Sequence, residues 1–203
     1  EALRSQTHEF RNKMQVILGM LHMQCYEELA GYVRQIANEQ KAEASFVGAR
    51  IRETVLAGFL LSKLSRAREL GILMELKEES YLPATDNDEV IHGLVTIIGN
   101  LVDNAFEAMV ECDKKQLVLW LYWESGILSL RVKDTGQGIS PMMGARIFER
   151  GISTRGTGRG VGLALVKESI EMMNGRIMLE NQGGEGTTFF VQVPYSVAEK
   201  KEK

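Results

Sequence analysis

The spacing of apolar residues predicts two helices at the start of the chain. The first ~65 residues contain no proline and follow helical spacing almost throughout. One apolar stripe steps alternately by four and three residues, which is typical of a coiled-coil seam, and a second set widens it toward a bundle helix. The seam comprises Leu3, Thr7, Phe10, Met14, Ile17 and Leu21, and the second set Val16, Met20 and Met23. A second amphipathic helix begins at Tyr26 and continues through Leu29, Val33, Ile36 and Ala37.

These two helices cannot bury their apolar faces by themselves. We therefore expect them to pair with a second copy of the chain as a four-helix dimer. An intramolecular bundle is the alternative, and it is less favoured because few other helices remain.

From residue 52 onward the pattern alternates between helix and strand, which predicts an α+β fold with strands in one layer and helices in the other. The second of the predicted helices is capped by Thr85 and Asp86, and the third ends at Gly175. The predicted helices are 52–69, Asp86–Glu111 and Gly160–Asn174. The predicted strands are Ile72–Leu76, the hairpin Gln116–Trp123 with Ile127–Lys133, and the hairpin Arg176–Glu180 with Thr187–Val193, which turns at residues 183–186. We expect a helical unit over 1–68, a second domain over 69–196 and a charged tail over 197–203.

The predicted helix Asp86–Glu111 carries an unusual polar stripe beside its apolar one. The apolar members are Val90, Leu94, Ile97, Ile98, Leu101, Val102, Ala105 and Met109, and the polar members are Asn100, Asp103, Asn104 and Glu107. Offsets of three and four place the polar side chains on one helical face. Asn and Asp are poor helix formers, so their presence indicates a function. Amide oxygens beside a carboxylate suit Mg²⁺ that also holds phosphate oxygens.

Composition narrows the class of protein. The 203 residues have a formal net charge of −3, which gives no electrostatic case for nucleic acid. Cys25 and Cys112 match no ligand spacing and are expected to be reduced cytoplasmic thiols. Apolar runs such as 55–61 and 117–123 are too short to span a bilayer. The chain begins at Glu1, without a signal peptide, which predicts a piece of a longer protein whose remainder can include a membrane anchor.

A carboxylate and two glycines follow the predicted strand that ends at Lys133. The segment reads Asp134-Thr135-Gly136-Gln137-Gly138. The glycines allow the backbone to approach a flat ligand, and Asp134 can accept a hydrogen bond from an amine such as adenine N6. On its own, the segment is more typical of a plain turn.

A glycine-rich segment runs directly into the predicted helix near residue 160. Glycines alternate at positions 156, 158, 160 and 162, and the segment reads Gly156-Thr157-Gly158-Arg159-Gly160-Val161-Gly162-Leu163. A helix amino terminus offers free N–H groups to phosphate. The chain has no Gly-Lys-Ser/Thr, so this is not a P-loop, and the residues from Phe148 to Arg155 do not resemble the strand that a dinucleotide-binding motif requires. A flexible lid over a triphosphate fits better.

His8 stands out on the first predicted helix. It lies just outside the apolar seam, with Glu9 beside it and Asn12 one helical turn further on. A single exposed histidine usually has no function, and His22 and His92 lack comparable neighbours.

Taken in order, these segments resemble the cytoplasmic kinase core of two-component sensor histidine kinases, over nearly the whole chain. His8-Glu9-Phe10-Arg11-Asn12-Lys13 is similar to the H box, Asn100 to Ala105 to the N box, and Asp134 to Gly138 to the G1 box. Phe148 is similar to the F box, Gly156 to Leu163 to the G2 box, and Gly184 to Phe189 to a terminal glycine box. The residues of the H box and of Gly160 to Val166 are most similar to those of the citrate and C4-dicarboxylate sensors.

The resemblance implies a helical hairpin that dimerises as a four-helix bundle, followed by a Bergerat-type ATP-binding domain. It implies ATP and Mg²⁺ as cofactors, with adenine read by Asp134 and Mg²⁺ held by Asn100 and Asn104. The implied nucleotide-binding residues also include Asp103, Gly136, Gly138, Phe148, Gly158, Arg159, Gly160, Val161, Gly162, Leu163 and Thr187. His8 would accept the γ-phosphoryl group at Nε2, and Glu9 would take the ring proton or orient the ring. Asn12 would serve a second activity, dephosphorylation of the regulator.

Three classes of function follow. The first is a histidine autokinase that passes phosphate to an aspartate on a response-regulator receiver domain. The second is a Bergerat-fold ATPase that drives conformational change without phosphohistidine. The third is a scaffold dimer without ATP, disfavoured because the nucleotide boxes are intact. The first class implies the cytoplasmic portion of an inner-membrane sensor, attached to the membrane only through amino-terminal segments that this chain lacks.

Overall fold

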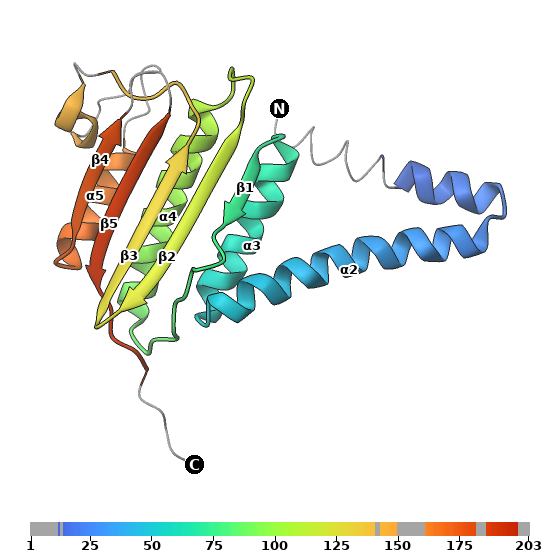
Figure 1. Ribbon diagram of the computed structural model, residues 1–203, viewed down its shortest axis with the longest axis horizontal. Helices are drawn as coiled ribbons and strands as arrows, with labels where there is room; N and C mark the ends of the chain where they lie inside the picture. The colour runs from blue at the N-terminus through green and yellow to red at the C-terminus, as the bar shows by residue number, and fades with distance from the viewer. Residues whose placement is uncertain (1–11, 13, 141–142, 150–160, 182–185, 199–203) are drawn as a thin grey trace, which may run out of the picture.

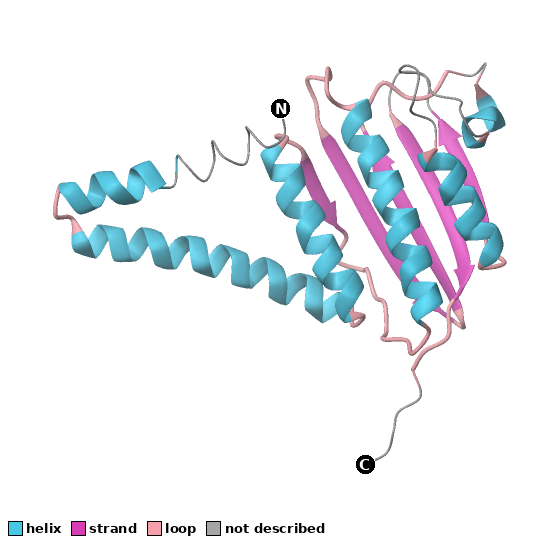
Figure 2. Cartoon of the chain, turned by 180° about the vertical axis from the view of Figure 1, so that it is seen from behind, coloured by secondary structure: helices cyan, strands magenta, loops and turns pink. Residues whose placement is uncertain are grey.

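The computed structural model describes residues 12, 14–140, 143–149, 161–181 and 186–198. Within them a five-stranded sheet has the order β1-β2-β3-β5-β4. Strand β1 is parallel to β2, and the other neighbours are antiparallel. Helices α3, α4 and α5 cover one face of this sheet and leave the other face open (Figures 1 and 2). The predicted α+β layering is confirmed.

The helices are α2 (Tyr26–Arg50), α3 (Thr54–Glu69), α4 (Asp88–Ala108), α5 (Gly162–Met172) and the 3₁₀ helix η1 (Gly144–Phe148). The strands are β1 (Leu73–Leu76), β2 (Gln116–Glu124), β3 (Ile127–Asp134), β4 (Arg176–Asn181) and β5 (Thr187–Pro194). Every element predicted after residue 52 is present, and its ends differ by a few residues. The predicted turn between β4 and β5 falls largely on residues 182–185, outside the described residues.

Two helix starts were predicted too early. Asn87, rather than Thr85 or Asp86, caps α4, because its side chain accepts a hydrogen bond from Val90 N at 3.2 Å. Thr85 instead accepts from Asn87 N and shapes the approach to the helix. Helix α3 starts at Thr54 because residues 51 and 52 are held by the segment before α4: Arg52 N donates to Leu82 O at 2.8 Å.

One hydrophobic core lies between the sheet and the helices. It extends along the chain from Val47, near the end of α2, to Tyr195 after β5. Helix α3 contributes its buried stripe to this core and packs against α4 and β1. The members of that stripe are Leu56, Leu60, Leu64 and Ala67. The domain boundary at residue 68 stays a prediction, although α3 shares its core with the sheet.

The amino-terminal part is a helical hairpin that projects from the sheet domain (Figure 1). Residues 14–22 are helical and turn at Gln24 into α2. Several large apolar side chains on this hairpin are exposed, which leaves them available to a partner. They are Val16, Leu18, Leu21, Met23, Tyr26 and Val33. Among the described residues, none of the helices combines the length and apolarity that crossing a membrane requires.

Candidate nucleotide site

Helix α4 positions the two predicted glycine segments relative to each other. A Cβ built on Gly162, at the start of α5, would lie 2.7 Å from Asn100 Oδ1. A Cβ built on Gly136 would lie 2.6 Å from the Cβ of Ala108, two helical turns further along α4. Glycine is therefore required at Gly136, where the backbone passes directly over α4, while a side chain at Gly162 would displace the Asn100 amide. Asn104 lies between these two contacts on the same helix.

The two asparagines present amide groups toward this space. Asn100 Nδ2 donates to Thr96 O at 2.8 Å, which leaves its oxygen on the side of Gly162. Asn104 Nδ2 is buried and has no hydrogen-bond partner among the described residues. An unpaired buried amide is unfavourable unless a ligand or water completes its bonding. The unpaired Asn104 Nδ2 is a donor that suits a phosphate oxygen near the amino terminus of α5, whereas an amide oxygen such as Asn100 Oδ1 suits Mg²⁺.

Asp134 is the buried carboxylate of the site, with only 3% of its surface exposed at the end of β3. Among the described residues, two backbone N–H groups donate to it, Gly136 N at 2.8 Å and Thr187 N at 3.3 Å, and both reach Oδ1. That arrangement leaves Oδ2 for a ligand. Burial raises the pKa of this carboxyl above its usual value, and the two N–H donors oppose that rise.

The backbone around Asp134 is tightly fixed. Gly186 has φ of +104°, and a Cβ built on it would lie 2.0 Å from Asp134 O, so no other residue fits there. Thr187 follows it at the start of β5 and is buried. Thr135 Oγ1 donates to Lys114 O at 2.8 Å and accepts from Gln116 N at 2.9 Å. Thr135 and Ala108 thus support the site, and neither role was predictable from local sequence patterns.

Asp103 lies away from the predicted nucleotide residues. Its Oδ1 is 2.6 Å from Lys63 Nζ on α3, and this ion pair occupies the α3 side of α4. The structure therefore does not bring Asp103 together with Asn100 and Asn104 at α5. The polar residues predicted to share one face of the helix therefore meet two different neighbours, α3 at Asp103 and α5 at Asn100.

The other predicted residues fall into two groups. Phe148 packs edge-on against Phe189 of β5 with ring centroids 6.5 Å apart, and Gly138 has a left-handed φ of +72°. Val161 is half exposed just before α5, and Leu163 packs partly into the core. Asn12 is helical and exposed. His8, Glu9, Gly158, Arg159 and Gly160 lie outside the described residues.

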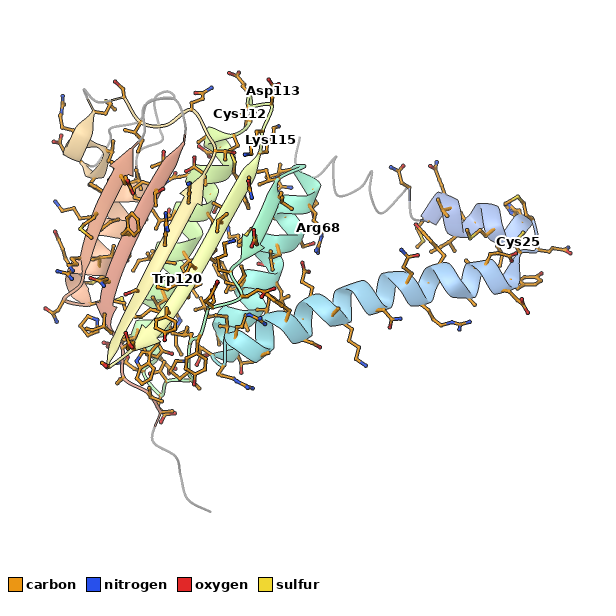
Figure 3. All side chains as sticks on the ribbon, viewed as in Figure 1. Cys25, Arg68, Cys112, Asp113, Lys115 and Trp120 are labelled. Carbon is orange, nitrogen blue, oxygen red and sulfur yellow. The ribbon has the colours of Figure 1, made fainter. Side chains whose placement is uncertain are left out.

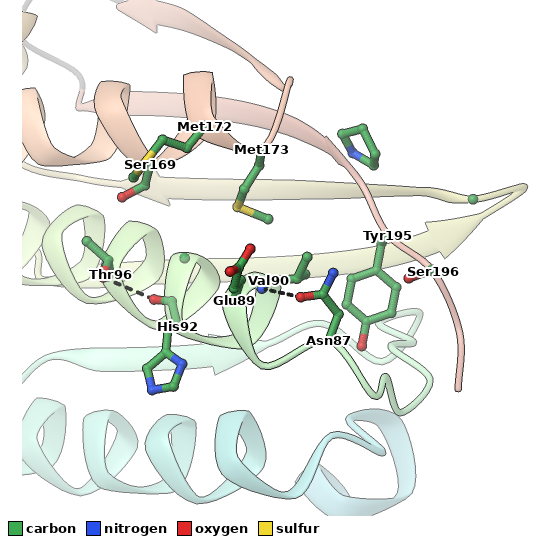
Figure 4. Close-up of a pocket in the computed structure, with 13 residues that line it drawn as sticks. Asn87, Glu89, Val90, His92, Thr96, Ser169, Met172, Met173, Tyr195 and Ser196 are labelled. Carbon is green, nitrogen blue, oxygen red and sulfur yellow. Dashed lines mark hydrogen bonds between the residues drawn. The ribbon is translucent and has the colours of Figure 1, made fainter. Parts of the chain in front are cut away.

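A separate groove of about 930 Å³ lies at the opposite ends of α4 and α5. Figure 4 shows Met173, the residue after α5, directed toward Glu89 and Val90 of α4. None of the predicted nucleotide residues that the structure describes lines this groove. The asparagines, the aspartate and the glycines of the candidate site gather instead toward the carboxyl end of α4, where Cys112 and Lys115 are labelled in Figure 3.

Comparison with known proteins agrees with this geometry. Residues 89–197 match the family model described as histidine kinase-, DNA gyrase B-, and HSP90-like ATPase. Residues 1–47 match the model described as the alpha-helical domain of SpoOB-type sensor kinases. The chain is 42% identical over 195 residues to the sensor histidine kinase DcuS of Escherichia coli K12 and 37% identical over 194 residues to the sensor protein CitS of Bacillus subtilis 168.

Each alignment covers 96% of this chain and 36% of the relative, so the chain spans about a third of the length of these relatives. Among solved structures, full-length ShkA in complex with AMPPNP is 25% identical with a TM-score of 0.60, and the match covers 97% of this chain and 46% of that one. The mycobacterial sensor histidine kinase MprB has the same fold at a TM-score of 0.56, over 68% of this chain and 93% of that one. The family model alone covers more than half of the residues. The chain therefore belongs to the family of histidine kinase-, DNA gyrase B- and HSP90-like ATPases.

Proposed function

We propose that this chain is the kinase core of a two-component sensor, which phosphorylates its own His8 from ATP and passes the phosphoryl group to an aspartate of a response regulator. The observation that carries the proposal is the placement of α4, whose Ala108 lies against Gly136, itself beside Asp134 Oδ1, and whose Asn100 lies against Gly162. A nucleotide with its base at Asp134 and its phosphates at α5 would fit that arrangement.

The described residues suggest that different parts of the site bind the base and the phosphates of ATP. Asp134 Oδ2 accepts from adenine N6 while Oδ1 stays fixed by Gly136 and Thr187. Asn100 and Asn104 would hold Mg²⁺, and the absence of a side chain on Gly162 lets the amino terminus of α5 lie close to Asn100, where its N–H groups would meet phosphate. Bound Mg²⁺ supplies charge neutralisation on the phosphates. Gly158, Arg159 and Gly160 would complete this cradle.

The transfer itself needs positioning more than covalent chemistry. The His8 imidazole is neutral at pH 7 in a large fraction of molecules, because its unperturbed pKa is ~6.5. One ring nitrogen forms the new N–P bond, the bond between the γ-phosphorus and the bridging oxygen breaks, and ADP leaves. Glu9 accepts or holds the proton of the other ring nitrogen.

The helical hairpin supports the remaining parts of the proposal. Its exposed apolar residues fit a homodimer that buries them in a four-helix bundle. Asn12, exposed on the same helix, would orient water during dephosphorylation of the regulator. The helical match ends at residue 47 and α3 packs in the sheet core, which favours assigning α3 to the catalytic domain. The parent protein would be an inner-membrane sensor for di- or tricarboxylates.

An ATPase without phosphohistidine is the competing function, and one labelling experiment separates the two. The chain is incubated with Mg²⁺ and ATP labelled at the γ-phosphate, and the protein is tested for acid-labile, base-stable label. We expect that label to disappear in His8→Gln and to persist in the matched control His22→Gln. Steady ATP hydrolysis without labelled protein would refute the kinase and support the ATPase. Regulator dephosphorylation that is unchanged in Asn12→Ala would refute the phosphatase role.

A further inference from the structure

The open face of the sheet is less polar than such a face usually is. An antiparallel sheet with one solvated side normally alternates apolar residues inward with polar residues outward. Here the inward residues of β2, such as Leu119 and Leu121, are fully buried, yet the outward ones include Trp120 and Tyr122. Their rings stack with centroids 5.5 Å apart (Trp120 is labelled in Figure 3).

The strand register lines up a row of large side chains across this face. Trp120 of β2 is paired with Arg131 of β3, Arg131 with Phe190 of β5, and Phe190 with Met178 of β4. The Arg131 guanidinium lies 5.1 Å from the centroid of the Phe190 ring, and Met178 is 56% exposed. The row spans four strands, which is about 14 Å. Cation–π contact and stacking account for part of this row, but not for the exposed methionine at its end.

A second row, two residues further along the strands, adds charge and a cavity. Lys133 is paired with Thr188 and Thr188 with Glu180. Arg131, Lys133, Thr188 and Glu180 line a cavity of about 70 Å³, which Asp134 and Gly186 close at the strand ends. That volume is larger than one water molecule needs. Arg131 and Lys133 balance the two carboxylates that line the cavity, Asp134 and Glu180, and together with the Thr188 hydroxyl they provide hydrogen-bond donors for an entering carboxylate.

We propose that the open sheet face, defined by Trp120, Arg131, Lys133, Phe190 and Met178, binds a short acidic and apolar segment of a partner protein. A carboxylate of the segment enters the Lys133–Thr188 cavity, and a neighbouring apolar side chain rests on Phe190 and Met178. Rows of adjacent alternate residues lie about 7 Å apart, which matches the spacing of side chains on one side of an extended peptide.

Charge decides between this partner and a nucleic acid. The outward positions of β2 to β5 carry three cations, Arg131, Lys133 and Arg176, against two anions, Glu124 and Glu180. The chain as a whole has a net charge of −3. A long polyanion is repelled by that total, whereas a short acidic segment interacts mainly with the local cations within a Debye length of about 8 Å.

The two tryptophans provide a direct test, because Trp120 lies on the open face and Trp123 donates its indole N–H to Tyr195 O toward the other side. The probe is a blocked six-residue peptide of alternating glutamate and phenylalanine, added to the ¹⁵N-labelled chain without nucleotide. We expect the Trp120 indole signal, assigned with Trp120→Phe, to move with saturable dependence while the Trp123 signal stays in place. The double variant Arg131→Glu with Lys133→Glu should bind at least about tenfold more weakly.

The matched control is Lys167→Glu, which makes the same kind of charge reversal on the exposed side of α5 and should bind the peptide like the parent chain. Several outcomes would overturn the proposal: an unmoved Trp120 signal at millimolar peptide, equal binding by the double variant, or equal binding of a peptide with lysine in place of glutamate. Tighter binding of an oligouridylate would assign the face to nucleic acid instead. Movement of the Trp120 signal with protein concentration alone would assign it to a second copy. The assay omits ATP, so its result is independent of the kinase activity.

Discussion

Replacing Asp134 by Asn tests the proposed ligand-binding oxygen, Oδ2, separately from Oδ1, which accepts two backbone hydrogen bonds. Oδ1 accepts from Gly136 N at 2.8 Å and from Thr187 N at 3.3 Å, and an asparagine oxygen can keep both bonds. The substitution therefore changes only the second atom, from an accepting oxygen to a donating NH₂ group. An adenine N6 amine would then face another donor.

The expected loss follows from the energy of one buried, charge-assisted hydrogen bond, about 1.5–3 kcal/mol. Since about 1.4 kcal/mol is a factor of ten, ATP should bind roughly 10- to 100-fold more weakly. Inosine triphosphate, which carries an oxygen where adenine has the amine, should lose less or gain. The fold should not weaken, because the asparagine removes a carboxylate whose burial is unfavourable.

Isothermal titration of ATP and inosine triphosphate against both chains measures the preference, and thermal unfolding measures stability. We expect the ratio of the two affinities to shift toward inosine triphosphate while the melting temperature stays equal or rises. Unchanged ATP affinity in a folded Asp134→Asn protein would refute the assignment of Oδ2 to the base. A lower melting temperature with proportionate loss of both nucleotides would instead identify Asp134 as purely structural.

Three further predictions concern stability and backbone fit. Gly186→Ala should abolish ATP binding by titration, because its Cβ meets Asp134 O, whereas Gly126→Ala, with φ of +82° and open space, should only lose stability; equal effects would contradict the steric argument. Tyr195→Phe removes a 2.6 Å hydrogen bond from the buried hydroxyl to Pro83 O, so calorimetry should show a loss of about 1–3 kcal/mol; an unchanged melting temperature would refute it. Burial raises the pKa of Asp134 in the folded protein above its ordinary value of 3.8. Between the unfolded and the folded pKa the native state binds more protons than the unfolded state, so the contribution of Asp134 to the free energy of unfolding should fall as pH rises through this range. Urea titrations at several pH values should show this fall in the parent chain and a smaller one in Asp134→Asn; identical slopes would contradict it.

The elements of the fold were predictable because each carries its own period. The stripe of α4 repeats every three or four residues, and the outward and inward residues of β2 alternate, so a single sequence distinguishes helix from strand. The strand order β3-β5-β4 was harder to predict, because β5 rather than β4 pairs with β3 although β4 comes first in the chain. Pairing between distant segments depends on the shared core, which local spacing does not encode.

The sequence predicted several residues of the site but not how packing arranges them. Asp134 and the glycines could be named, but Ala108, whose Cβ sets the approach of Gly136, is an ordinary helix residue in the sequence. Three neighbouring residues, Thr85, Asp86 and Asn87, have side chains that can cap a helix, and Asn87 is the one that accepts a hydrogen bond from Val90 N. Such choices are made by tertiary packing among equivalent local options.

Asp103 illustrates how a helical face can be divided. At 100° per residue, Asn104 lies about 40° from Asn100 around the axis, but Asp103 lies about 60° to the other side. A stripe at spacing three and four is therefore wide enough to face two neighbours, α5 through Asn100 and α3 through Asp103. Lys63, with 16% of its side chain exposed, holds Asp103, and Phe59 one turn earlier contacts the Gly99 position of α4. Helix α3 thus fixes the rotation of α4 that aims Asn100 and Asn104, and α3 is in turn joined to α2 by the ion pair of Arg68 with Glu43 at 2.6 Å.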